Sequence, residues 1–340
     1  MSAQIFKSTD DFALELGGVL PGVEIAYHTY GTPNPDGDNV VWVCHALTAN
    51  SDVADWWPGT VESECFLDPD RWFVVCANIL GSCYGTTGPL SVNPTTGQPW
   101  FGTFPQLTMR DVVRAHILLA DHLGIQGIHA LVGSSVGGFQ ALEWAVMQPE
   151  RFNKLVLIAT APKANPWTIA IDETQRMAIE ADSTYGQPFA EAGAAGLAAA
   201  RALGLLTYRG SHGYNITQQD PADFSPGKQP HRACTYQRHQ GDKLVNRFNA
   251  YSYVTILDTF DTHDIGRDRG GIDSALASIT AKTMAIGLST DIIFTPDEMR
   301  QLAQAIPGAE YRQIDSLFGH DGFLVENGQL NSILVPFINK

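Results

Sequence analysis

A serine flanked by glycines stands where an apolar run ends and a stretch with helical spacing begins. Residues 133–137 read Gly-Ser-Ser-Val-Gly and follow the apolar run Ile128–Leu131. A Gly-x-Ser-x-Gly pattern between a strand and a helix is typical of a nucleophile elbow, a sharp turn that exposes a catalytic serine. The pattern selects Ser135, because Ser134 would need a glycine at position 132, where the chain has a valine. Ser135 is therefore the predicted nucleophile, at a helix N-terminus whose N–H groups stabilise a developing oxyanion.

A serine hydroxyl is unreactive at neutral pH, so it needs a general base, and the base needs a carboxylate to orient it. In sheets built around such an elbow, the partners follow in the order Ser, Asp or Glu, His. Among ten histidines, only His320 lies a few residues after the last predicted strand. Asp291 lies just past the strand before it, where a loop would place its carboxylate at the C-terminal edge of the sheet. We predict a triad of Ser135, Asp291 and His320.

Two backbone N–H groups should stabilise the oxyanion of the acyl-transfer intermediate. One belongs to Val136, the residue after the nucleophile, and the other comes from the turn after an early strand of the sheet. That turn is His45-Ala-Leu-Thr48, directly after the apolar run Val40–Cys44. We assign the second N–H to Leu47, and expect His45 to shape the turn rather than act as a base.

The elements that must position these residues alternate between strand and helix. The early strands are close together, which predicts an antiparallel start that passes into a parallel sheet. Capping boxes at Thr108 and Thr295 mark the starts of two helices. The predicted strands are residues 12–16, 23–30, 40–44, 72–77, 128–132, 155–158, 283–287 and 311–314.

The alternation is interrupted by a helical segment rich in alanine and glutamine, which contains a predicted helix at Ala190–Arg201. The fold class expected from this pattern is α/β: an α/β-hydrolase fold with a mostly parallel sheet flanked by helices and an inserted helical cap. We predict a catalytic domain formed by residues 1–163 and 256–340, with residues 164–255 as the cap.

Composition excludes several classes of function. The formal net charge of −15 disfavours a broad surface for nucleic acid or anionic membranes. The sequence has neither an apolar run of membrane-spanning length nor the apolar core of a signal peptide. Its five cysteines lack zinc-type spacing, and free thiols in a reducing compartment fit them best. We expect a cytoplasmic protein with no metal site and no permanently bound cofactor.

Together, the motifs resemble the homoserine O-acetyltransferase family of α/β-hydrolase-fold acyltransferases. The resemblance spans almost the whole chain, cap included. The matching segments are residues 44–48 (Cys-His-Ala-Leu-Thr), 78–89, 133–140, 206–209, 240–248 (Gln-Gly-Asp-Lys-Leu-Val-Asn-Arg-Phe), 261–267 and 319–324 (Gly-His-Asp-Gly-Phe-Leu). It implies a ping-pong reaction with acetyl-CoA as co-substrate and homoserine as acceptor, in an enzyme that forms a homodimer through its cap.

The resemblance also implies an acceptor pocket. By similarity, Arg201 would bind the acceptor carboxylate, a task suited to a planar guanidinium with two parallel donors. Tyr208 would assist in that pocket, and Asp321 would hold the acceptor ammonium. From the sequence alone, Arg201 would be read only as the end of an alanine-rich helix.

Other functions remain open at this stage. Related enzymes of this fold could use a succinyl donor or acylate serine instead of homoserine. An esterase or thioesterase would use the same triad with water as the acceptor, and what separates it from a transferase is an acceptor pocket and exclusion of water from the acyl-enzyme.

Overall fold

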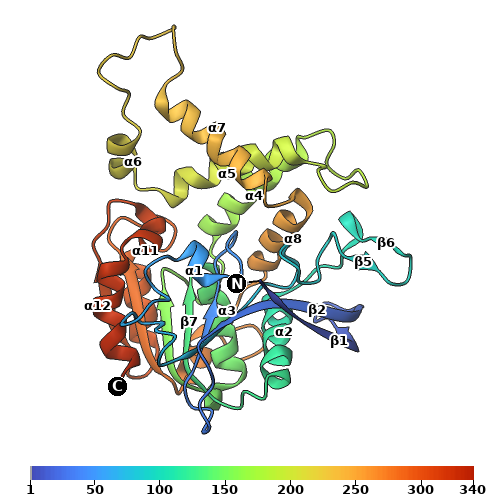
Figure 1. Ribbon diagram of the computed structural model, residues 1–340, viewed down its shortest axis with the longest axis vertical. Coiled ribbons are helices and arrows are strands. Elements are labelled where there is room, and N and C mark those ends of the chain that lie inside the picture. Colours follow the sequence, from blue (N-terminus) through green and yellow to red (C-terminus); the bar gives the residue numbers. More distant parts are fainter. Residues whose placement is uncertain (1) are drawn as a thin grey trace.

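The computed structural model describes residues 2–340, and a single eight-stranded sheet forms its centre (Figure 1). The strands are ordered β1-β2-β4-β3-β7-β8-β9-β10. A separate two-stranded ribbon pairs β5 with β6. The strands are β1 (Gln4–Ala13), β2 (Val19–Tyr30), β3 (Val40–Cys44), β4 (Phe73–Ala77), β5 (Val92–Asn93), β6 (Gln98–Pro99), β7 (Ile128–Ser134), β8 (Phe152–Ile158), β9 (Lys282–Leu288) and β10 (Glu310–Ile314).

The direction of the strands confirms the antiparallel start and the parallel continuation. β1 pairs antiparallel with β2, and β2 antiparallel with β4, whereas every other pairing in the eight-stranded sheet is parallel. The prediction of a strand at residues 12–16 was wrong, because β1 ends at Ala13. Most residues of β1 are exposed at the sheet edge, so its start carries too little apolar patterning to be recognised.

Helices cover both faces of the sheet and form two apolar cores. One core packs α2 and α3 against the sheet, and the other packs α12 and the segment around Trp57 against the opposite face. Both predicted capping boxes are present, at Thr108 with Asp111 and at Thr295 with Glu298. The helices outside the cap are α1 (Val53–Trp56), α2 (Met109–His122), α3 (Val136–Met147), α9 (Ile272–Ala277), α10 (Pro296–Ala305), α11 (Gly322–Val325) and α12 (Asn327–Ile338), with short 3-10 turns η1 (Phe101–Thr103), η2 (Pro149–Arg151) and η3 (Gly319–Asp321).

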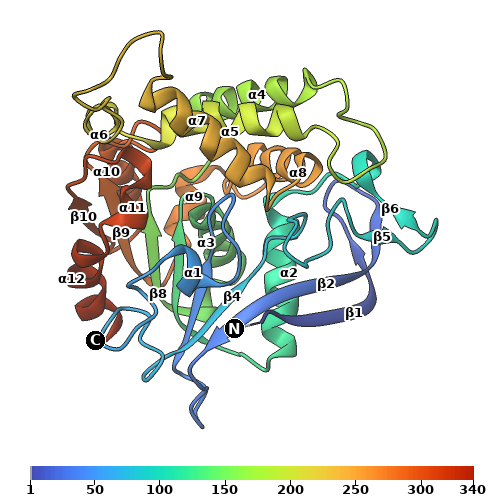
Figure 2. The ribbon, with the colours of Figure 1, turned by 45° about the horizontal axis from the view of Figure 1, so that its top comes forward.

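The remaining helices form a layer across the C-terminal ends of the parallel strands (Figure 2). They are α4 (Pro166–Glu180), α5 (Ala194–Tyr208), α6 (Ser211–Thr217), α7 (Arg232–Val245) and α8 (Ala250–Asp261). The helix predicted at Ala190–Arg201 is α5, which starts four residues later, at Ala194, and continues seven residues further, to Tyr208. The predicted boundary between residues 255 and 256 falls inside α8.

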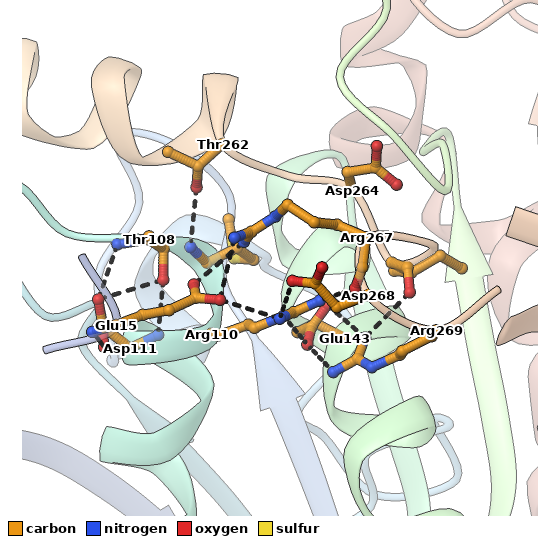
Figure 3. A network of polar contacts seen from close by, with 12 residues as sticks. Glu15, Thr108, Arg110, Asp111, Glu143, Thr262, Asp264, Arg267, Asp268 and Arg269 are labelled. Atoms are coloured by element: carbon orange, nitrogen blue, oxygen red, sulfur yellow. Dashed lines mark hydrogen bonds and ion pairs between the residues drawn. The ribbon is translucent and has the colours of Figure 1, made fainter. Parts of the chain in front are cut away.

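A partly buried ionic network ties the return from the cap to the catalytic domain (Figure 3). Arg110 from α2 and Arg267, which follows α8, both donate hydrogen bonds to the carboxylate of Glu15, at 2.9 and 3.0 Å. Arg269 pairs with Glu143 of α3, with contacts of 3.1 and 2.5 Å. Since α3 is the helix of the predicted elbow, this network fixes it to the chain that leaves the cap.

Candidate active site

The turn between β7 and α3 has the strained geometry of a nucleophile elbow. Ser135 has φ of 55° and ψ of −123°, a left-handed backbone that non-glycine residues rarely adopt. Its N–H donates a hydrogen bond to the carbonyl of Ile158 at 2.9 Å, and its carbonyl accepts one from the Thr160 hydroxyl at 2.9 Å. These bonds to the end of β8 and the residues after it hold the serine in place.

The glycines of the motif are required by close backbone approach. A Cβ atom on Gly133 would lie 2.2 Å from the carbonyl oxygen of Gly137. A Cβ atom on Gly137 would lie 2.0 Å from the carbonyl oxygen of Cys44. Any side chain at either position would therefore push the first turn of α3 away from β3 and β7.

The structure brings the three residues predicted as a triad together. His320 Nε2 lies 2.8 Å from Ser135 Oγ, and His320 Nδ1 lies 2.7 Å from Asp291 Oδ2. The other oxygen of Asp291 accepts hydrogen bonds from the N–H groups of Ile293 and Phe294, at 2.8 and 3.2 Å. All three side chains are buried. This chain of hydrogen bonds can move a proton from the serine to the imidazole.

Strand register explains why residues so far apart in sequence meet. Leu288 of β9 pairs with Ile314 of β10, so the loops that carry Asp291 and His320 leave the sheet side by side. Cys44 of β3 pairs with Gly133 of β7 in the same way, which places the turn after β3 next to the elbow.

The charge of Asp291 tunes the base. Burial acts to lower the pKa of His320, but the charge and hydrogen bond of the Asp291 carboxylate outweigh it, and the pKa lies above its ordinary value. A more basic imidazole accepts the serine proton more readily, and the carboxylate stabilises the imidazolium that results.

The two residues predicted to form the oxyanion hole both line the cavity at Ser135. Val136 is the first residue of α3, so its N–H has no carbonyl one turn earlier to bond with. Leu47 lies in the turn after β3, and within residues 2–340 its N–H donates to no other group. His45 braces this turn: it is fully buried, its Nδ1 contacts the Ala46 carbonyl at 2.8 Å, and its Nε2 accepts from the Ile79 N–H at 3.1 Å.

The cavity has a volume of about 650 Å³ and lies between the sheet and the cap. Arg201 and Tyr208 of α5 line it, with the guanidinium 5.6 Å from the centre of the Tyr208 ring. Arg201 forms no ion pair with the residues that the structure describes, so its donors can bind a carboxylate. Burial raises the pKa of Tyr208 to about 12, so its hydroxyl stays protonated as a donor.

Asp321 also lines the cavity, but it already has a cationic partner. Its Oδ2 lies 2.9 Å from Nε of Arg209, the residue after α5. Burial raises the pKa of the Asp321 carboxyl, which the positive charge of Arg209 only partly offsets. A substrate ammonium at Asp321 would therefore share this carboxylate with Arg209 or displace it.

Sequence reasoning missed the charged side chains that the cap and its edge add to the cavity wall, which are Asp172, Arg209, Lys243 and Arg247; Asp55 of α1 also lines the cavity. Burial raises the pKa of Asp172 well above its ordinary value. No local pattern marks these residues, because they meet only when the cap helices cross over the sheet. Lys243 and Arg247 do lie in the matching segment 240–248, which could have drawn attention to them.

Among residues 2–340, no three His, Cys, Asp or Glu side chains are grouped so that they could hold a metal ion. None of the described helices is both long and apolar enough to span a membrane.

Comparison with known proteins decides the family. A family model described as alpha/beta hydrolase fold matches residues 39–327. The homoserine O-acetyltransferase of Cyclobacterium marinum is 44% identical over 337 residues, covering 99% of this chain and 95% of that protein. The chain belongs to the homoserine O-acetyltransferase family. The fold class and the family expected from the sequence are thus both confirmed.

Solved structures show that this family shares its fold with esterases. The homoserine O-acetyltransferase of Bacillus anthracis superposes with a TM-score of 0.91 at 23% identity, covering 100% of this chain and 98% of that one. An acetylester hydrolase from Corynebacterium glutamicum superposes with a TM-score of 0.88 at 22% identity, covering 99% and 96%. The fold alone therefore does not separate acyl transfer from hydrolysis, and the cavity must be used to decide.

Proposed function

We propose that this protein is a homoserine O-acetyltransferase, which transfers acetyl from acetyl-CoA to the hydroxyl of L-homoserine and so serves methionine biosynthesis. The observation that carries the proposal is the unpaired Arg201 guanidinium beside Tyr208, in the same cavity as the triad. A simple esterase has no need to grip an amino-acid carboxylate, whereas a transferase must hold its acceptor and exclude water. The near full-length likeness to a named homoserine O-acetyltransferase supports the same acceptor.

The geometry supports a ping-pong reaction in two half-reactions. Ser135 Oγ attacks the thioester carbonyl while His320 Nε2 takes its proton, and the N–H groups of Leu47 and Val136 stabilise the oxyanion. The imidazolium then returns the proton to the departing CoA thiolate, which leaves acetyl on Ser135. In the second half-reaction, His320 removes the proton from the homoserine hydroxyl, whose oxygen attacks the acetyl carbonyl. The ester leaves, and the proton returns to Ser135.

Arg201→Ala is expected to raise the KM for homoserine strongly and to lower kcat, while acetylation of Ser135 by acetyl-CoA stays close to the wild-type rate. A charge-assisted hydrogen bond to a carboxylate contributes about 1.5–3 kcal/mol, so a 10- to 100-fold loss in kcat/KM for the acceptor follows. The two half-reactions are measured separately, by rapid acylation without acceptor and by turnover over a range of homoserine. Equal losses in both would mean that Arg201 supports the cap instead of the acceptor.

The proposed function is tested by thiol release from acetyl-CoA and from succinyl-CoA, each with homoserine, with serine and without an acceptor. We expect fast release only with acetyl-CoA and homoserine. Release that does not depend on the acceptor would mean that water takes the acyl group and that the protein is a hydrolase. Preference for succinyl-CoA or for serine would instead replace the substrate in this proposal and leave the mechanism intact.

We further propose that the protein acts in the cytoplasm as a homodimer that assembles through its cap. The support is the family likeness and the exposed apolar side chains of the cap helices, which include Met177, Leu206 and Ile216. Light scattering should then report twice the chain mass of 36.9 kDa, and a monomer at working concentration would contradict the dimer.

A further inference from the structure

Two basic side chains at the C-terminal end of α7 line the catalytic cavity and have no part in the chemistry described above. Lys243 lies in the last turn of α7, and Arg247 follows just beyond its end. Both side chains are exposed. Within residues 2–340, neither forms an ion pair with a carboxylate.

Contacts of Arg247 hold it at the cavity. Its guanidinium donates hydrogen bonds to the carbonyl oxygen of Thr48 and to the hydroxyl of Tyr84. Thr48 follows Leu47, so the guanidinium is anchored beside the oxyanion turn instead of extending freely into solvent. A guanidinium has five N–H donors, and these contacts leave some of them available.

A helix C-terminus by itself favours basic residues in its last turn, and that could account for Lys243 on an isolated helix. It does not account for a second cation fixed against the oxyanion turn, with both side chains facing the same cavity. Only one of the three other acids that line the cavity opposes them: Asp321 is paired with Arg209, burial holds the pKa of Asp172 well above its ordinary value, and Asp55 is the remaining carboxylate. The local charge on this wall of the cavity therefore favours an anion.

The proposed donor has the matching shape and charge. A CoA thioester carries its reactive carbonyl at the end of a neutral pantetheine arm and its phosphates at the other end, so the phosphates must stay at the outer part of the cavity. We propose that Lys243 and Arg247 bind the phosphate groups of the acyl-CoA donor. This inference rests on the proposed function, because it takes the donor to be a CoA thioester.

The test compares donors that carry the same acetyl group with different numbers of phosphates. The donors are acetyl-CoA, acetyl-dephospho-CoA, which lacks the 3′-phosphate, and S-acetylpantetheine, which lacks all of them. The quantity measured is the ratio of kcat/KM for acetyl-CoA to that for S-acetylpantetheine, at saturating homoserine. In Lys243→Glu this ratio should fall about 10- to 100-fold, as expected for losing a charge-assisted hydrogen bond. The donor at which wild-type kcat/KM drops identifies the phosphate bound. A drop with acetyl-dephospho-CoA indicates the 3′-phosphate, and a drop only with S-acetylpantetheine indicates the diphosphate.

Arg238→Glu is the matched control, because Arg238 is an exposed basic residue of the same helix that does not line the cavity. It should keep the wild-type ratio. Arg247→Gln is the second variant: releasing Thr48 will slow acylation by every donor, but the ratio should fall as well. The wild-type KM for acetyl-CoA should also rise with ionic strength, and less so in Lys243→Glu.

Three results would overturn the inference. An unchanged ratio in both Lys243→Glu and Arg247→Gln would mean that the phosphates bind elsewhere. An equal fall in the ratio for Arg238→Glu would mean a general effect of surface charge. A wild-type enzyme that is acetylated by neutral esters but releases no thiol from any acyl-CoA would refute the proposed function itself, and this inference with it.

Discussion

Ser135→Ala is expected to abolish the acetyl-enzyme and to lower kcat by about 10⁶-fold, as removal of the nucleophile does in other serine triads. The physical reason is that, among the described residues, only the Ser135 hydroxyl lies within hydrogen-bonding distance of His320 Nε2, at 2.8 Å. Without Oγ the oxyanion hole and the imidazole remain, but no covalent intermediate can form. The measurement is the intact protein mass after incubation with acetyl-CoA in the absence of acceptor.

Ser134→Ala is the control for this experiment. Ser134 is the last residue of β7, its side chain is buried, and its hydroxyl has no hydrogen-bond partner among the described residues. Its removal should leave acetylation of the protein intact. A Ser135→Ala protein that still gains one acetyl group would refute Ser135 as the nucleophile, whether or not Ser134 carries that group.

The parts of the site that could be predicted are those set by local backbone geometry. The Gly-x-Ser-x-Gly pattern selected Ser135 because only glycine fits at positions 133 and 137. At both positions a neighbouring backbone carbonyl leaves no room for a Cβ atom. His320 and Asp291 could be selected because parallel strands bring their C-terminal loops to one edge, and the register of β9 with β10 places those loops together. In each case a short segment carries the information.

The parts that could not be predicted depend on how distant segments pack. The ion pair between Arg209 and Asp321 joins the end of α5 to the turn that carries the catalytic histidine. No pattern in either segment predicts this contact with the other. The exposed start of β1 is fixed by pairing with β2 rather than by its own apolar pattern. Cap residues such as Lys243 reach the cavity only because α7 packs across α5. Their position at the cavity therefore cannot be predicted from the sequence around them.

Asp291→Asn is expected to lower kcat by about 10⁴-fold although the site keeps its shape, as the equivalent change does in a serine protease triad. Asp291 accepts hydrogen bonds on both oxygens, from the N–H groups of Ile293 and Phe294 on one and from His320 Nδ1 on the other. An asparagine would keep its carbonyl oxygen toward the two backbone N–H groups and turn its NH₂ group toward His320. The imidazole would then carry its proton on Nε2, where it cannot accept the proton of Ser135.

The pH dependence of acylation gives this prediction a second readout. The reaction needs neutral His320, whose pKa Asp291 holds above its ordinary value despite burial, so the wild-type rate should rise through an inflection on the high side of a normal histidine. In Asp291→Asn the burial remains and the charge is gone, so the residual rate should show its inflection at lower pH. Asp297→Asn, an exposed aspartate paired with Arg300 in α10, should change neither the rate nor the inflection. If Asp291→Asn retained a rate within tenfold of the wild type, the carboxylate would not be setting the tautomer of His320.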